Sequence, residues 1–137
     1  MLNEFQKRRL SITITGIEED LYDIEECLKS QDYHGVLYEI RNDIPMTTRD
    51  AMIANIMLIR KGISSLAEQF GLRGETRMLS RKISSKLSIL WVSLEETKAR
   101  RLTGYGEVTA GLHDLLDPAL DEIIALFEEI RQALRNV

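Results

Sequence analysis

The stretch LDPALDEIIALFEEIRQAL, residues 116–134, carries the clearest pattern in this chain. Its large apolar side chains recur at alternating spacings of four and three residues. They are Leu116, Leu120, Ile123, Phe127, Ile130 and Leu134. This spacing places them in one narrow stripe along an α-helix. Because Asp117 and Pro118 are suited to an N-cap and a first helical residue, the stretch predicts a helix over 117–135.

Three earlier segments repeat the same spacing and predict three more helices. The stripes are Leu10, Ile14, Ile17, Leu21, Ile24 and Leu28; then Met52, Ile56, Ile59, Ile63, Leu66 and Phe70; then Ile83, Leu87, Leu90 and Leu94. The helices they predict cover residues 8–30, 48–70 and 75–103. A heptad-like repeat in all four helices is typical of left-handed, coiled-coil-like packing.

Capping residues mark the ends of the second predicted helix. Thr47 and Asp50 form an acidic relative of the capping box, which predicts its start. Gly71 predicts its end, because glycine adopts the left-handed cap conformation at little cost. Gly74 then allows the chain to reverse, so the connection is short and the second and third helices are expected to form an antiparallel hairpin.

A fifth, shorter helix is expected near residues 33–42. Tyr33, Leu37, Ile40 and Ile44 repeat the apolar spacing out of phase with the first stripe. The sequence therefore predicts an all-α fold, an antiparallel (up-down-up-down) four-helix bundle with heptad-like core stripes and this additional helix. We expect residues 1–137 to form a single domain, because the length and the composition, 44% apolar and 29% charged, suit one core.

Composition also predicts a location. Cys27 is the single cysteine and cannot form an internal disulfide. No run of about 18 apolar residues is present, so no membrane-spanning helix or apolar signal segment is expected. A reducing cytoplasm is the default location for such a chain.

Charge is divided unevenly along the chain. Residues 1–43 and 105–137 are acidic, whereas residues 44–104 carry eleven basic and five acidic side chains. Mutual attraction between neighbouring helices is the favoured explanation. The alternative is an anion or nucleic-acid face on the third helix. Its residues would be Arg73, Arg77, Arg81, Lys82 and Lys86. A sequence pI near 5.3 argues against nucleic acid as a partner.

No catalytic residue, metal ligand, cofactor or small-molecule ligand can be assigned from the sequence. His34 and His113 are far apart, and neither belongs to a Glu-x-x-His pair. Acidic residues crowd the first helix, and we interpret them as a solvated face. The alternative function that they leave open is a magnesium-dependent enzyme acting on a phosphorylated substrate through acidic residues of the first and fourth helices.

The second and third helices carry more apolar residues than their stripes need. The surplus residues form the candidate interface: Ile53, Met57, Leu58, Ile89, Trp91 and Val92. Three interpretations remain open, namely an interior position, a homodimer interface centred on Trp91, and a groove for another helical protein. We therefore expect a non-enzymatic assembly, adaptor or regulatory subunit that acts through helix surfaces, as a homodimer or with another helical protein. The alternatives are the magnesium enzyme and an accessory nucleic-acid-associated subunit.

Overall fold

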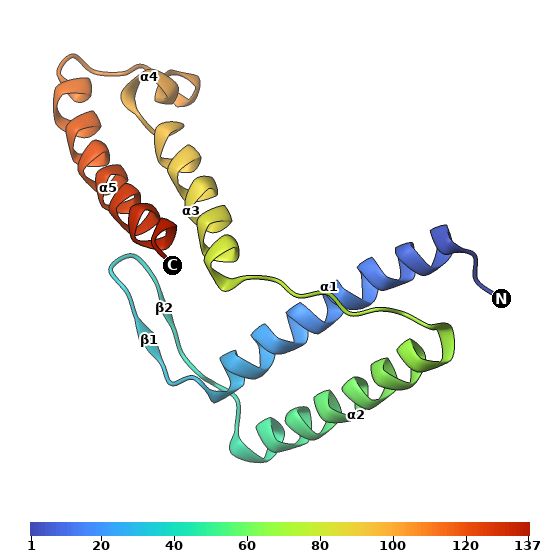
Figure 1. Cartoon of the computed structure of the whole chain (residues 1–137). Helices are drawn as coiled ribbons and strands as arrows, with labels where there is room; N and C mark the ends of the chain where they lie inside the picture. Colours follow the sequence, from blue (N-terminus) through green and yellow to red (C-terminus); the bar gives the residue numbers. More distant parts are fainter. The chain divides into compact units, whose positions relative to one another are not determined.

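The computed structural model describes the whole chain, residues 1–137, and 72% of it is helical. The helices are α1 (Glu4–Lys29), α2 (Met46–Phe70), α3 (Leu79–Glu95), α4 (Ala99–Leu102) and α5 (Leu112–Arg135), with a 3-10 turn at Thr103–Tyr105 and two short strands, β1 (Tyr33–His34) and β2 (Glu39–Ile40) (Figure 1). The predicted all-α class, four long helices with one additional short helix, is confirmed. The additional short helix is α4, and not a helix at residues 33–42, where it was expected.

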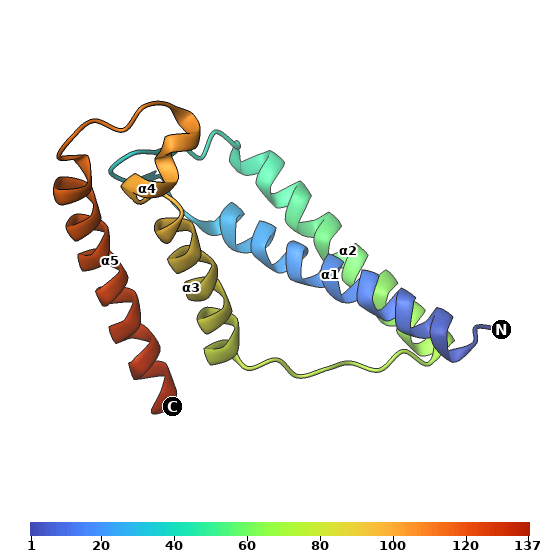
Figure 2. The ribbon, with the colours of Figure 1, turned by 90° about the horizontal axis from the view of Figure 1, so that it is seen from above.

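The chain divides into two compact units, Met1–Gly74 (unit 1) and Glu75–Val137 (unit 2). In unit 1, α1 packs against α2; in unit 2, α3 packs against α5, which also contacts α4. Both pairs are antiparallel, as the two views in Figures 1 and 2 agree. The segment 72–78 between α2 and α3 contains no helix. The short connection expected there is therefore wrong, and the hairpins that the structure shows are α1 with α2 and α3 with α5.

Unit 1 is centred on a small apolar cluster. Leu21 and Leu28 of α1 and Ile56 of α2 are buried together, and Ile44, Met52, Ile53 and Ile63 pack against them. All three buried residues belong to the predicted stripes. Asn3 caps α1 in a reciprocal arrangement with Gln6, which satisfies two backbone amides at the helix start.

Of the two predicted ends of α2, the C-terminal end is confirmed and the N-terminal end is wrong. Gly71 has φ 65° and its backbone amide donates to the Ala67 carbonyl, so the glycine C-cap is confirmed. The helix begins at Met46 after Pro45, and no side chain caps it. The Thr47 capping box is therefore wrong, because Thr47 already lies inside the first turn. Proline is tolerated at this position, since its ring fixes φ near the −60° observed and its missing N–H leaves no helix hydrogen bond unmade.

The short helix expected near residues 33–42 is wrong, because this segment forms a β-hairpin. Tyr33 pairs with Ile40 and His34 with Glu39 in antiparallel register. Asn42 closes the base of the hairpin, where its backbone amide donates to Asp32 and its side-chain amide donates to the Ser30 carbonyl. Leu37 at the tip is 96% exposed, so the out-of-phase apolar spacing does not mark a buried stripe.

Gly35 is required by this hairpin, and replacing it by alanine should open the turn. An added Cβ would lie 2.7 Å from the Tyr38 carbonyl oxygen and 2.9 Å from the Tyr33 ring, closer than carbon atoms tolerate. Gly35→Ala should abolish the cross-strand Tyr33–Ile40 contact in NMR spectra while the helices remain. Gly16→Ala is the control, because an added Cβ there meets nothing within 4 Å and should stabilise α1 by about 1 kcal/mol. A hairpin that persists in Gly35→Ala would contradict this prediction.

Unit 2 differs from the predicted helix ends. α3 stops at Glu95, and the residues after it form α4 and the 3-10 turn, so the expected helix over 75–103 is shorter and broken. α5 starts at Leu112, after Gly111 with φ 90°. The prediction that Asp117 and Pro118 open this helix is therefore wrong. Leu87 of α3, Ala99 of α4 and Ile124 of α5 are the buried apolar residues of the unit.

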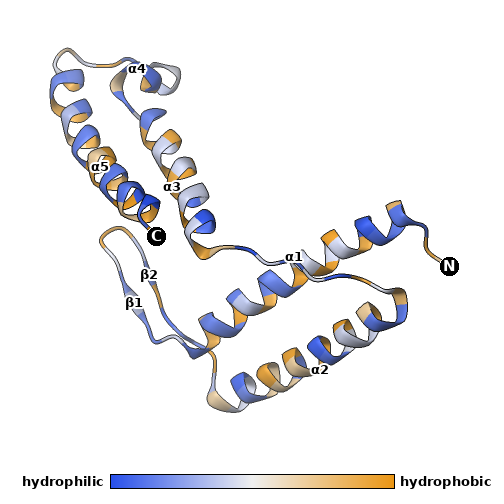
Figure 3. Ribbon diagram, in the orientation of Figure 1, coloured by the Kyte–Doolittle hydropathy of each residue, from blue (hydrophilic) through white to orange (hydrophobic).

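Hydrophobic residues are distributed along every long helix, with hydrophilic residues between them (Figure 3). None of the helices is both long enough and apolar enough to span a membrane. The finding agrees with the sequence, in which charged residues lie between the apolar positions of each stripe.

Candidate functional site

The six residues of the predicted interface are divided between the two units. Ile53, Met57 and Leu58 belong to α2, whereas Ile89, Trp91 and Val92 belong to α3. Ile53 packs against the unit 1 core, and the other five are exposed. On α3 they do not share a face, because at about 100° per residue Ile89 and Trp91 point to nearly opposite sides of the helix.

A broader apolar surface lies on unit 2. Its exposed residues are Leu79, Leu90, Ile123, Leu126 and Ile130, and we call this set the α3–α5 apolar side. Leu126 is 57% exposed, because it lies two positions after the buried Ile124 and points nearly to the opposite side of α5, three positions from Ile123 and four from Ile130. The apolar arc of α5 is thus wider than the part that α3 covers.

Helix geometry places these residues on one side of the hairpin. Leu87 and Ile124 are the buried apolar residues of α3 and α5. A side chain three positions after another is rotated from it by about 60° around the helix. When two helices are antiparallel, the same rotation turns side chains of both helices toward the same side of the hairpin. Leu90 is three positions after Leu87, and Ile123 is one position before Ile124. Both steps rotate the side chain in the same direction, so Leu90 and Ile123 lie on the same side of the hairpin. The sequence pattern assigned Ile123 and Ile130 to the core, whereas the structure buries Ile124.

Unit 1 has the same design. Ile24 follows Leu21 by three positions, and Ile59 follows Ile56 by three positions. Both are exposed, as is Ile17 on the same side of α1, and we call Ile17, Ile24 and Ile59 the α1–α2 apolar side. Each two-helix hairpin therefore buries the centre of its apolar stripe and leaves one edge of it uncovered.

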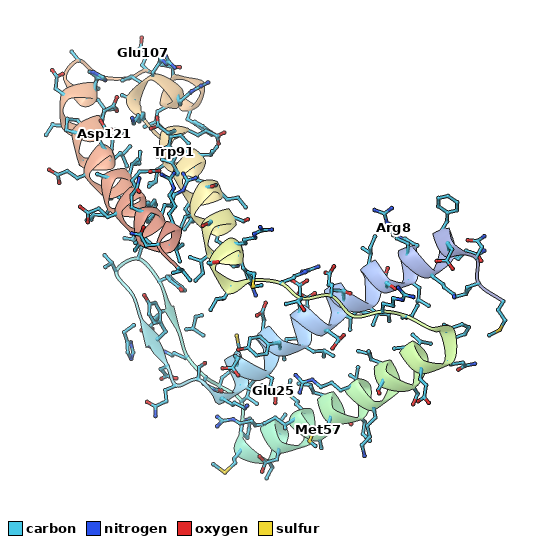
Figure 4. All side chains as sticks on the ribbon, viewed as in Figure 1. Arg8, Glu25, Met57, Trp91, Glu107 and Asp121 are labelled. Carbon is cyan, nitrogen blue, oxygen red and sulfur yellow. The ribbon has the colours of Figure 1, made fainter.

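The opposite side of unit 2 is polar and contains a cavity of about 530 Å³. Trp91 lies four positions after Leu87, which rotates it away from the apolar side, and it lines this cavity. The complete lining is Trp91, Val92, Glu95, Glu96, Lys98, Arg100, Arg101, His113 and Asp117. Figure 4 shows Trp91 on α3 and Asp121 on α5.

Asp117 is the buried polar residue of this cavity. Its Oδ1 accepts the backbone N–H of Ala99 at 2.9 Å, and its Oδ2 lies 2.7 Å from Nδ1 of His113. The Ala99 amide and, secondarily, the His113 ring hold the pKa of Asp117 below its ordinary value. Because Nδ1 is engaged, Nε2 is the nitrogen that His113 can offer to a molecule in the cavity.

Lys98 joins α5 to the end of α3. Its ammonium lies 2.7 Å from Asp121 and 3.1 Å from Glu95. The Asp121 carboxylate, followed by that of Glu95, raises the pKa of Lys98 above its ordinary value. The sequence pattern did not single out Lys98 or Asp121, because they are 23 positions apart and meet only when the α3–α5 hairpin closes.

The predicted basic face on the third helix is divided. Arg73 and Arg77 precede α3, and Arg77 makes a two-point ion pair with Glu75. Within α3, Lys82 and Lys86 are four positions apart and share a face, whereas Arg81 lines a small cavity with Ser84 and Arg135. The prediction that all five residues share one helix face is therefore wrong.

The acidic residues of α1 are partly engaged in ion pairs. Glu25 pairs with Arg60 of α2 and with Lys29, and the Arg60 guanidinium lowers the pKa of Glu25. Figure 4 shows Glu25 in the α1–α2 hairpin. In the structure, no group of three or more His, Cys, Asp or Glu side chains is arranged to hold a metal ion.

Comparison of the chain with protein-family models, with curated proteins and with solved structures finds no match. Its function must therefore be argued from its own residues.

Proposed function

We propose that this protein is a non-enzymatic interaction protein, an assembly, adaptor or regulatory subunit that acts through helix surfaces and forms a homodimer. The observation that carries the proposal is the uncovered edge of the apolar stripe on each hairpin, above all the α3–α5 apolar side. Contiguous apolar surface of this kind is costly to leave in water and is typical of protein interfaces.

A second copy is the partner we favour because the surface suits isologous contact. A two-fold axis brings the same patch of both copies together, and an aliphatic patch is complementary to itself. The α3–α5 apolar side is aliphatic throughout: about three helical turns separate Leu79 from Leu90 on α3, and about one turn separates each of Ile123, Leu126 and Ile130 from the next on α5. Two such hairpins that pack against each other through this side would form a four-helix bundle, which a single hairpin cannot form.

The test is the molar mass in solution. Sedimentation or light scattering at several concentrations should give about 31 kDa, twice the 15.7 kDa of one chain. Leu126→Glu, which places a carboxylate in the α3–α5 apolar side, should give a folded monomer. Ala125→Glu is the matched control, because the neighbouring residue points away from that side and should leave the mass near 31 kDa.

Two outcomes would contradict the proposal. A mass near 15.7 kDa for the unaltered chain at all concentrations would exclude the homodimer. Loss of the dimer in Met57→Glu but not in Leu126→Glu would place the interface on α2, which carries three residues of the candidate interface predicted from the sequence.

We also propose a cytoplasmic location. The support is the single Cys27, whose side chain is exposed as a free thiol, a state that a reducing compartment preserves. Location of a fluorescent fusion in intact cells tests this part of the proposal.

A further inference from the structure

A second cavity, of about 400 Å³, lies in unit 1 at the end of the hairpin where α1 begins and α2 stops. In both views the N-terminal end of α1 lies beside the C-terminal end of α2 (Figures 1 and 2), and Figure 4 places Arg8 in this part of α1. The lining is Glu4, Lys7, Arg8, Ser11, Gly71, Leu72 and Arg73. We propose that this cavity binds a small phosphorylated molecule through its phosphate group.

Helix periodicity and one glycine bring the cationic side chains together. Ser11 lies four positions after Lys7 and three after Arg8, so it shares a side of α1 with each of them, and all three line the cavity. Gly71 then redirects the chain after α2 through its left-handed conformation, which its φ of 65° shows. The two residues that follow turn back toward α1, so Arg73 reaches the same cavity as Lys7 although 66 positions separate them in the sequence.

The charge balance of this cavity favours an anion. Lys7, Arg8 and Arg73 provide three positive charges, and Glu4 is the one carboxylate in the lining. Glu4 lies 3.8 Å from Lys7 and is almost fully exposed, so water screens much of its charge. The C-terminal end of α2 adds about half a negative charge. The cavity therefore retains a positive surplus.

The hydrogen-bonding groups suit phosphate in particular. The two guanidinium groups present planar donors that match phosphate oxygens, and the Lys7 ammonium supplies a compact third charge. The Ser11 hydroxyl can donate to a further oxygen. The cavity volume lies within the range of small-molecule sites, about 300–1,000 Å³, so a phosphate with an organic group attached fits it better than a bare ion.

Titration of the full chain with inorganic pyrophosphate and with phenyl phosphate, followed by ³¹P NMR and calorimetry, tests the proposal. We expect saturable binding with one site per chain. Arg73→Gln and Arg8→Gln should each weaken binding by about ten-fold or more. Arg9→Gln is the matched control, because Arg9 neighbours Arg8 but does not line the cavity, and it should change the affinity by less than about two-fold. Circular dichroism should show unchanged helix content in all three variants.

Three results would overturn the inference. The first is no saturable binding of either phosphate compound up to about 10 mM. The second is binding that Arg8→Gln and Arg73→Gln leave unchanged. The third is tighter binding of a single-stranded oligonucleotide that Arg9→Gln weakens as much as Arg8→Gln does, because that result would assign these charges to a nucleic-acid surface.

Discussion

Replacing Leu28 by alanine should lower the free energy of unfolding of unit 1 by about 2–4 kcal/mol. Leu28 is 3% exposed and lies in the cluster with Leu21 and Ile56. The substitution removes buried methyl groups and leaves a cavity that two helices cannot easily close. A unit of fewer than about 80 residues rarely has more than 3–5 kcal/mol of stability, so this one change should remove most of it.

Hydrogen exchange read by mass spectrometry is the appropriate measurement, because it reports α1 and α2 separately from the rest of the chain. Amides of both helices should exchange many times faster in Leu28→Ala. Ile12→Ala is the control on the same helix: Ile12 is 57% exposed, and its loss should cost less than about 0.5 kcal/mol. Equal acceleration by both substitutions would show that unit 1 does not depend on this cluster.

The four long helices could be predicted because their apolar spacing is a local property. Leu21, Leu28 and Ile56 lie in the predicted stripes and are the residues that unit 1 buries. Gly71 could be predicted for the same reason, since its left-handed conformation depends on the residue itself. What the stripes do not determine is which edge of each helix a neighbour covers. Ile123 was therefore assigned to the core, although its neighbour Ile124 is the buried one.

The β-hairpin shows a second limit of a spacing argument. Four apolar residues between 33 and 44 match a helical period, but the structure pairs Tyr33 with Ile40 in strands. Gly35 and the β-favouring tyrosines were the available signals. A run of about ten residues is too short for the period alone to distinguish the two structures.

Both cavities are assembled from residues that are distant in the sequence. Lys7 and Arg73 line one of them, and Trp91 and Asp117 line the other. A sequence pattern recognises residues that share one helix, so it grouped Arg73 with the residues of the third helix instead of with Lys7. Asp117 is another residue whose contact is made with a distant part of the chain. The sequence predicted it as the cap of its own helix, whereas its carboxylate accepts the first backbone amide of α4, 18 positions earlier.

That contact makes Asp117 the second residue whose replacement should have a large effect. The Ala99 amide that it accepts is buried, and a buried amide without an acceptor is costly. Asp117→Ala should therefore detach α4 from α5 and strongly lower the stability of unit 2. Asp117→Asn should do less, because an amide oxygen can still accept the Ala99 N–H but has no charge to offer His113.

The effect of the charge should depend on pH in a defined direction. The pKa of Asp117 is lower in the folded chain than its ordinary value near 3.8, so the folded state holds this proton less tightly than the unfolded state does. The ionised carboxylate therefore contributes stability above that ordinary pKa, and the contribution is lost as the pH falls through the lowered folded pKa. Asparagine does not titrate, so Asp117→Asn lacks this part of the acid dependence.

Urea unfolding followed by Trp91 emission measures unit 2 alone, because Trp91 is the single tryptophan. At pH 7 the order of stability should be unaltered chain, then Asp117→Asn, then Asp117→Ala. Between about pH 5 and pH 2 the gap between the unaltered chain and Asp117→Asn should narrow. Asp114→Asn, an exposed position in the first turn of α5, should show a smaller gap at pH 7. If the unaltered chain and Asp117→Asn differ by the same amount at every pH, the charge of Asp117 adds nothing to the Ala99 hydrogen bond, and the oxygen atom alone holds α4 in place.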